Sequence, residues 1–120
     1  MNNGELDKSA EAPIMGGKGR EMRIISKRTL KEFWVNPHYS DSQGQLEAWH
    51  NEVLKADWAT PQALKAQLAN ASILQDSRVV FNIKGNDYRL IVKINYPYRI
   101  VYIRFVGTHK MYDQINAVTI

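Results

Sequence analysis

The stretch RVVFNIKGNDYRLIVKIN, residues 78–95, decides the fold of this chain. Apolar and polar residues alternate on both sides of Gly85-Asn86, which is the pattern of half-buried strands. A Gly-Asn pair between two such runs is typical of a tight hairpin turn. The stretch therefore predicts an antiparallel hairpin in which Asn82 pairs with Arg89.

A third strand, Tyr98–Val106, is expected after the hairpin, because the alternation resumes beyond Tyr96-Pro97. A symmetric turn at Tyr96-Pro97 would place Arg89 opposite Arg104 in the neighbouring strand. The sequence thus predicts a three-strand antiparallel meander.

Before the meander, the pattern predicts a short strand and three helices. Asn36-Pro37 should end the first helix, Ser42 is a candidate N-cap for the second, and Thr60-Pro61 is typical of a helix start. The expected elements are the strand Arg23–Ser26 and helices over Lys27–Val35, from Ser42, and from Thr60 to about Asn70. The fold class is therefore α+β, with an N-terminal strand and helices packed on an antiparallel sheet that ends in the meander.

The alternation gives the meander one apolar face and one polar face. The apolar face should hold Val79, Phe81, Ile83, Tyr88, Leu90, Val92, Ile94, Val101, Ile103 and Phe105. The polar face should hold Arg78, Asn82, Lys84, Arg89, Lys93, Asn95, Tyr98, Tyr102 and Arg104. The expected pairing puts Asn82, Arg89 and Arg104 in one row. Because adjacent like charges destabilise a sheet, this row favours a bound phosphate or RNA over an ordinary solvated face.

The segment after the third strand, GTHKMYD, carries candidate groups for proton transfer. Thr108 can cap a short helix over His109–Ile115, in which His109, Tyr112 and Asp113 share one face. A histidine oriented by a carboxylate is suited to acid–base chemistry near neutral pH. The alternative is that His109 is structural or merely exposed.

Charge and composition limit the other classes of function. The chain has 120 residues, no cysteine and a net charge of +4. The last 43 residues hold seven basic and two acidic side chains, a balance of +5, which suits a polyanionic partner. No signal peptide or membrane span is evident, so we expect a cytoplasmic protein. The three histidines lack ligand spacing, and no serine-nucleophile motif or phosphate-binding glycine loop occurs, so neither a metal nor a cofactor is predicted.

Residues 1–21 differ from the rest of the chain, which we expect to form one domain over residues 22–120. The leader is rich in Gly, Lys and Glu and has no helical or strand period, so disorder is expected. Purine-rich codons suit the residues directly before Met22, as in a ribosome-binding site. Met22 is accordingly our candidate for the natural start.

Three segments resemble the HigB-type toxins of the RelE superfamily: Met22–Ser26, the hairpin from Arg78 to Ile91, and the closing stretch Phe105–Asp113 with its Thr-His-Lys and Tyr-Asp parts. The resemblance implies a RelE-like fold and a toxin of a type II toxin–antitoxin system. It also implies a metal-independent endoribonuclease that cleaves mRNA on the ribosome through 2′-hydroxyl attack on the phosphate. The implied partners are the ribosome with its mRNA and a HigA-type helix-turn-helix antitoxin. Operator DNA would be bound only through that antitoxin.

Matched by motif, Arg89 is the charge stabiliser and Arg104 its helper. His109 and Tyr112 are the acid–base candidates, and Lys84 and Lys93 are candidates for a cation or base. The residues expected to contact RNA or the ribosome are Arg78, Asn82, Lys93, Tyr98, Tyr102 and Lys110. Two alternatives stay open: a non-catalytic RNA- or ribosome-binding module using the same face, and a structural protein whose basic face binds an acidic segment of a partner.

Overall fold

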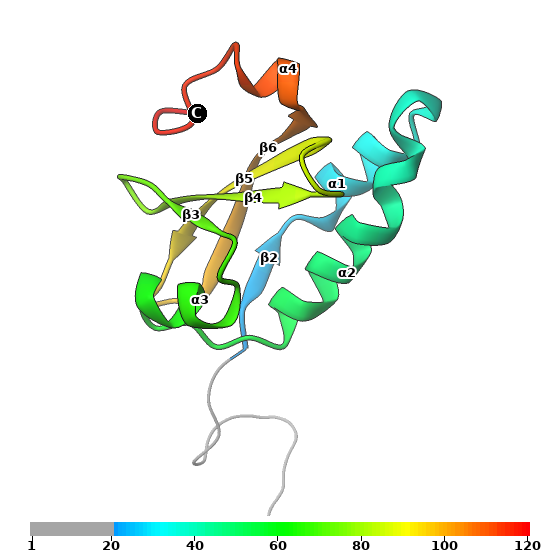
Figure 1. Ribbon diagram of the computed structural model, residues 1–120. Coiled ribbons are helices and arrows are strands. Elements are labelled where there is room, and N and C mark those ends of the chain that lie inside the picture. Colours follow the sequence, from blue (N-terminus) through cyan, green and yellow to red (C-terminus); the bar gives the residue numbers. More distant parts are fainter. Residues whose placement is uncertain (1–20) are drawn as a thin grey trace, which may run out of the picture.

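The computed structural model describes residues 21–120 (Figure 1), so residues 1–20 of the predicted leader lie outside the described residues. Along the chain the elements are β2 (Arg23–Ile25), α1 (Lys27–Trp34), η1 (Pro37–Ser42), α2 (Gln43–Leu54), α3 (Pro61–Gln67), β3 (Ser72–Ile73), β4 (Arg78–Ile83), β5 (Tyr88–Asn95), β6 (Ile100–Thr108) and α4 (His109–Tyr112). The predicted α+β class and the meander of β4, β5 and β6 are confirmed.

The sheet has five strands in the order β2-β6-β5-β4-β3. The meander is antiparallel as predicted, but β2 pairs parallel with β6, so the sheet is mixed rather than wholly antiparallel. Between β2 and β6 lie three α-helices and an even number of strand reversals, which bring β6 back in the direction of β2. The two-residue strand β3 at the opposite edge was not predicted.

The helices begin and end close to their predicted bounds. Asn36-Pro37 ends α1 as expected, and the Asn36 side chain accepts a hydrogen bond from the His38 amide, which starts the 3₁₀ helix η1. Ser42 does not cap α2: η1 runs directly into α2, and the Ser42 hydroxyl donates to the Tyr39 carbonyl instead. Thr60 does cap α3, by accepting from the Ala63 amide.

One face of the sheet packs against the helices and forms the hydrophobic core. Leu90, Val92 and Val101 are fully buried there, together with Leu30, Leu46, Val53 and Leu64 of the helices. The Trp49 and Phe81 rings meet edge to face, with 5.4 Å between their centroids. This face agrees with the predicted apolar face except at Phe105.

The register of β5 and β6 differs from the prediction. Asn95 pairs with Ile100 rather than with Tyr98, because the connection is a four-residue turn: Tyr96 is buried, and the Arg99 amide bonds back to the Tyr96 carbonyl. Further along, the pairing changes from Val92–Ile103 to Ile91–Phe105, which leaves Arg104 as the extra residue of a β-bulge. The Phe105 side chain is therefore turned away from the core, and the Val106 side chain packs against the core in its place.

The other face of the sheet, called the outer face below, is partly covered by the end of the chain. Figure 1 shows α4 and the segment after it on the side of the sheet opposite α2 and α3. Ile91 and Val80 belong to the outer face by the strand alternation, yet they are 0% and 5% exposed. No helix of residues 21–120 is long and apolar enough to cross a membrane.

Candidate active site

The predicted row of Asn82, Arg89 and Arg104 does not form. The β4–β5 hairpin has the expected register, and Asn82 does pair with Arg89. On the other side, however, Arg89 pairs with Gly107, because the four-residue turn and the bulge shift β6. The two arginines therefore belong to two separate groups of side chains on the outer face.

The first group joins β5 to α4. The guanidinium carbon of Arg89 lies 5.6 Å from the centre of the Tyr112 ring, a distance typical of a cation–π contact. The His109 amide donates to the Asp87 carbonyl at 3.3 Å, which fixes the start of α4 against the β4–β5 hairpin. Arg89, His109 and Tyr112 are thus brought to the same end of the sheet.

The short helix α4 presents the predicted tail residues. Thr108 caps it by accepting from the Met111 amide. The Nδ1 atom of His109 lies 3.4 Å from Oδ2 of Asp113, and both side chains are more than half exposed. The helix ends at Tyr112 rather than Ile115, but one turn suffices to bring His109 and Asp113 together.

Gly107, which the sequence reasoning missed, allows the close approach of α4. A Cβ atom at Gly107 would lie 2.6 Å from Cζ of Phe105 and 3.1 Å from the Met111 sulfur. No larger residue fits opposite Arg89 unless these side chains shift. A glycine inside a strand pattern is itself a signal of such an approach.

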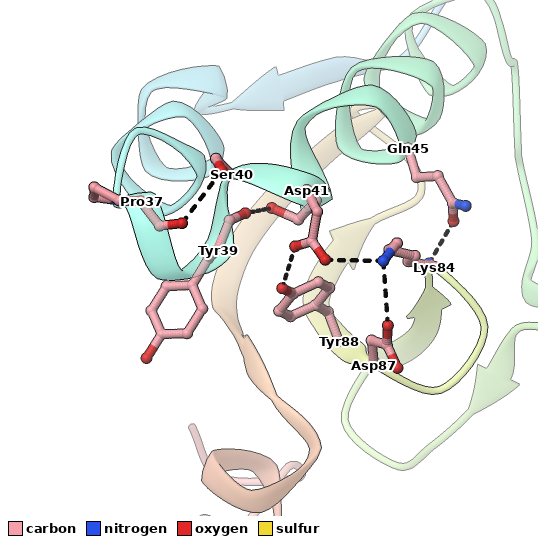
Figure 2. A network of polar contacts seen from close by, with 9 residues as sticks. Pro37, Tyr39, Ser40, Asp41, Gln45, Lys84, Asp87 and Tyr88 are labelled. Carbon is pink, nitrogen blue, oxygen red and sulfur yellow. Dashed lines mark hydrogen bonds and ion pairs between the residues drawn. The ribbon is translucent and has the colours of Figure 1, made fainter.

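Lys84 does not lie on the outer face. Its backbone is in the left-handed region, with φ of 53°, so Lys84 has left the strand and the alternation no longer applies. Figure 2 shows its ammonium group between two carboxylates: Nζ lies 2.8 Å from Oδ2 of Asp41 and 3.5 Å from Oδ2 of Asp87. The Tyr88 hydroxyl donates to the other oxygen of Asp41.

These contacts, called the Asp41 network below, shift three pKa values. Hydrogen bonds from Lys84 and then Tyr88 lower the pKa of Asp41. The Asp41 carboxylate raises the pKa of Lys84, and it raises that of Tyr88 to about 12. Lys84 therefore keeps its proton near neutral pH, which suits a cation better than a base. The sequence did not predict the contacts of Asp41 with Lys84 and Tyr88, because Lys84 and Asp41 are 43 residues apart.

The second group lies near the β5–β6 turn. The guanidinium carbon of Arg104 is 5.7 Å from the centre of the Tyr102 ring. Both residues and Lys93 line a cavity of about 350 Å³. The helper role expected for Arg104 beside Arg89 has no support in this arrangement.

The remaining predicted RNA contacts are scattered. Arg78 is only 8% exposed, and it donates to the Asp76 and Ile120 carbonyls, so it holds the end of the chain and is not available at the surface. Tyr98 is 72% exposed in the β5–β6 turn. Asn82 and Lys110 are exposed as well, on β4 and α4.

Three cations of the outer face lack a carboxylate partner among the residues that the structure describes. Arg28, Lys84 and Arg99 each have a carboxylate within 4.0 Å. Within residues 21–120, Arg89, Lys93 and Arg104 have none. Nor does that part of the chain hold a group of three His, Cys, Asp or Glu side chains that could bind a metal ion. The outer face therefore carries uncompensated positive charge, which is suited to a phosphate backbone.

Comparison with known proteins identifies the family. The sequence profile of the HigB toxin, described as the RelE-like toxic component of a toxin-antitoxin system, matches residues 42–115. The chain belongs to the HigB toxin family. It is 34% identical over 100 residues to the mRNA interferase toxin HigB of Escherichia coli strain K12, covering 81% of this chain and 93% of that protein. The mRNA interferase HigB of Escherichia coli O6:H1 is 23% identical over 97 residues, covering 79% and 92%.

The HigB family match spans both groups of the outer face, from the Asp41 network's neighbour Ser42 to Ile115 beyond α4. The resemblance seen in the hairpin and in the closing stretch is thus confirmed, and the α+β architecture is that of a RelE-like toxin.

Proposed function

We propose that this HigB-family toxin cleaves mRNA on the ribosome, and that Arg89, His109 and Tyr112 form its catalytic centre. Family membership makes the chain the toxic component of a toxin–antitoxin system, and the names of its relatives as mRNA interferases support an endoribonuclease. The observation that carries the site assignment is the contact between Arg89 and Tyr112 near His109, in which Arg89 has no carboxylate of residues 21–120 within 4.0 Å.

The proposed reaction is an internal transfer at one phosphate. The 2′-hydroxyl oxygen bonds to the adjacent phosphorus, and the bond from phosphorus to the 5′-oxygen breaks. One proton leaves the 2′-hydroxyl and one reaches the departing 5′-oxygen, so the products are a cyclic phosphate and a 5′-hydroxyl. No water is consumed in this step.

The side chains of the centre match these requirements. The Arg89 guanidinium can stabilise the extra negative charge of the pentavalent phosphorus through bidentate contacts. His109, oriented by Asp113, and Tyr112 carry the exchangeable protons. Lys84 acts as a cation that holds the hairpin through Asp41, and Lys93 and Arg104 bind RNA further along the outer face.

The proposed partners follow from the family. A HigA-type helix-turn-helix antitoxin would neutralise the toxin and would carry any operator DNA binding. The ribosome would present the mRNA, with Tyr98, Tyr102, Asn82 and Lys110 at the contact surface, and the site of action would be the cytoplasm.

Induction in cells with and without the cognate antitoxin, followed by mapping of mRNA 5′ ends, tests this proposal. We expect new 5′-hydroxyl ends within translated codons, which disappear when the antitoxin is present. Growth arrest and ribosome binding without new ends would favour the non-catalytic RNA-binding module instead.

A further inference from the structure

The cavity near the β5–β6 turn is built from chain segments that are distant from α4. It is lined by the last residues of β5, the first half of β6, their connecting turn and the residue before β4: Lys93, Asn95, Tyr96, Tyr102, Arg104 and Ser77, among others. Lys93 is four residues from Arg89 on the same strand, a separation of about 13 Å at the usual strand rise. The cavity is therefore separate from the proposed catalytic centre on the same face.

The β-bulge gives this cavity its second cation. Arg104 is the extra residue between the Val92–Ile103 and Ile91–Phe105 pairs, and bulges commonly redirect a side chain in this way. The guanidinium of Arg104 lies over the Tyr102 ring at 5.7 Å. A guanidinium stacked on a ring keeps its in-plane N–H donors for a phosphate.

The charges of the cavity call for an anion. Lys93 and Arg104 both line it, and neither has a carboxylate within 4.0 Å in the part of the chain that the structure describes. Arg99, in contrast, lies in the adjacent turn but is bound to Asp57 at 2.5 Å. Two cations left together beside an aromatic ring match the combination that binds single-stranded nucleic acid.

We propose that this cavity is a second RNA subsite, which binds a nucleotide other than the one cut, with Lys93 and Arg104 at its phosphate and Tyr102 at its base. A volume of about 350 Å³ is at the lower end for small-ligand sites and suits one nucleotide. The inference rests on the proposed function for the source of the RNA, either the mRNA or ribosomal RNA, since both present the same phosphate and base.

The test compares the double variant Lys93→Gln/Arg104→Gln with Lys31→Gln/Lys55→Gln, which removes two exposed cations from the helical side. The full chain is bound to ribosomes programmed with an mRNA that lacks the 2′-hydroxyl at the cleavage position. For the Lys93/Arg104 variant we expect at least tenfold weaker binding than for the control. We also expect its log–log salt dependence to be less steep by about 0.7 for each phosphate that the variant no longer neutralises.

A second measurement separates binding from chemistry. On a cleavable mRNA, the single-turnover rate at saturating toxin should stay within about twofold of wild type for the Lys93/Arg104 variant, while the half-saturating concentration rises. Tyr102→Leu should weaken binding by about tenfold, the lower range for loss of a base–aromatic stack. Circular dichroism establishes that each variant is folded.

Empty ribosomes and crosslinking identify the source of the nucleotide. If the subsite binds mRNA, the variant should lose affinity only for programmed ribosomes, and 4-thiouridine placed in the mRNA beside the cleavage position should crosslink to residues 93–104. If it binds ribosomal RNA, the affinity for empty ribosomes should fall equally. Binding as tight as the Lys31/Lys55 control, or a lower saturating rate with unchanged affinity, would overturn the subsite. A wild-type chain that binds ribosomes but never cuts would overturn the proposed function alone.

Discussion

Arg89 is the residue on which the proposed chemistry depends most. Its guanidinium carbon lies 5.6 Å from the centre of the Tyr112 ring, and no carboxylate of residues 21–120 lies within 4.0 Å of that guanidinium. A guanidinium in this state is ready to bind a phosphate, whereas Arg28 and Arg99 are already paired with Glu32 and Asp57.

We expect Arg89→Ala to abolish toxicity in a folded protein. Loss of a contact that stabilises transition-state charge costs about 10²–10³ in rate. Growth after induction and cleavage of ribosome-bound mRNA measure the effect, with Arg28→Ala as the matched control on α1. Growth arrest by a folded Arg89→Ala protein at the wild-type level would refute the role.

His109 is the first choice for proton transfer. A general acid or base contributes about 10²–10⁴ in rate, so His109→Gln should slow single-turnover cleavage on programmed ribosomes at least 100-fold. Substrate binding should change little, because the neighbouring cations remain. Asp113→Asn should have a smaller effect, since Asp113 only orients the ring from 3.4 Å.

Tyr112→Phe is the companion measurement for His109. If His109→Gln cuts at the wild-type rate, the assignment passes to Tyr112 or a lysine. Normal cutting by both variants would move proton transfer away from α4 to the sheet.

At the scale of elements, the Asp41 network ties η1 to the β4–β5 hairpin. Asp41 precedes α2, whereas Lys84, Asp87 and Tyr88 belong to the hairpin that carries Arg89 and supports the start of α4 (Figure 2). Figure 2 shows the Asp41 carboxylate between the Tyr88 hydroxyl and the Lys84 ammonium group. The network therefore positions the strand that carries Arg89 from the side of the sheet opposite the proposed RNA-binding face.

The pKa values of this network predict how stability depends on pH. Because the folded state raises the pKa of Tyr88 from 10.0 to about 12, its contribution is complete below pH 10 and is lost as pH rises from 10 to about 12. The midpoint temperature of thermal unfolding should thus fall more steeply with pH over that window for wild type than for Tyr88→Phe. If the midpoint fell equally steeply with pH in the two proteins, the hydrogen bond from Tyr88 to Asp41 would be contradicted.

The contribution of Asp41 to stability depends on pH in the opposite direction. The pKa of Asp41 is lowered below 3.8, so its contribution is present above that pH and is lost as pH falls through the folded value. Asp41→Asn should lack this acid-dependent part of the stability, as measured by the midpoint of thermal unfolding between pH 2.5 and 6. An identical acid profile for wild type and Asp41→Asn would show that the contact does not form in solution.

The elements also show how far local sequence patterns predict the structure. The β4–β5 register followed from alternation on both sides of a short loop, and it was confirmed. The β5–β6 register depended on the burial of Tyr96, the Arg99–Asp57 contact and the bulge at Arg104. These are tertiary contacts with no periodic signal, so a symmetric turn was the wrong choice, and the row with Arg104 failed with it.

At the scale of the molecule, the sheet separates two roles. The helices cover one face and enclose the core against it, while the outer face carries α4, the end of the chain and the cations Arg89, Lys93 and Arg104 (Figure 1). The sequence alone showed that the excess of positive charge lies in the last part of the chain. Only the fold shows that it divides into a centre at Arg89 and a cavity at Lys93 and Arg104.

The whole molecule also predicts that cleavage does not depend on a bound metal ion. The proposed charge stabilisation comes from Arg89 and the proposed proton carriers are His109 and Tyr112, so every part of the reaction has a side chain assigned to it. Purified toxin treated with EDTA should cleave ribosome-bound mRNA at the untreated rate, with magnesium kept in excess of EDTA so that the ribosomal subunits stay joined. EDTA still removes zinc and manganese under these conditions, since it binds them far more tightly than magnesium. A toxin that loses its activity with EDTA and recovers it only with zinc or manganese would show that a metal ion performs the charge stabilisation assigned to Arg89.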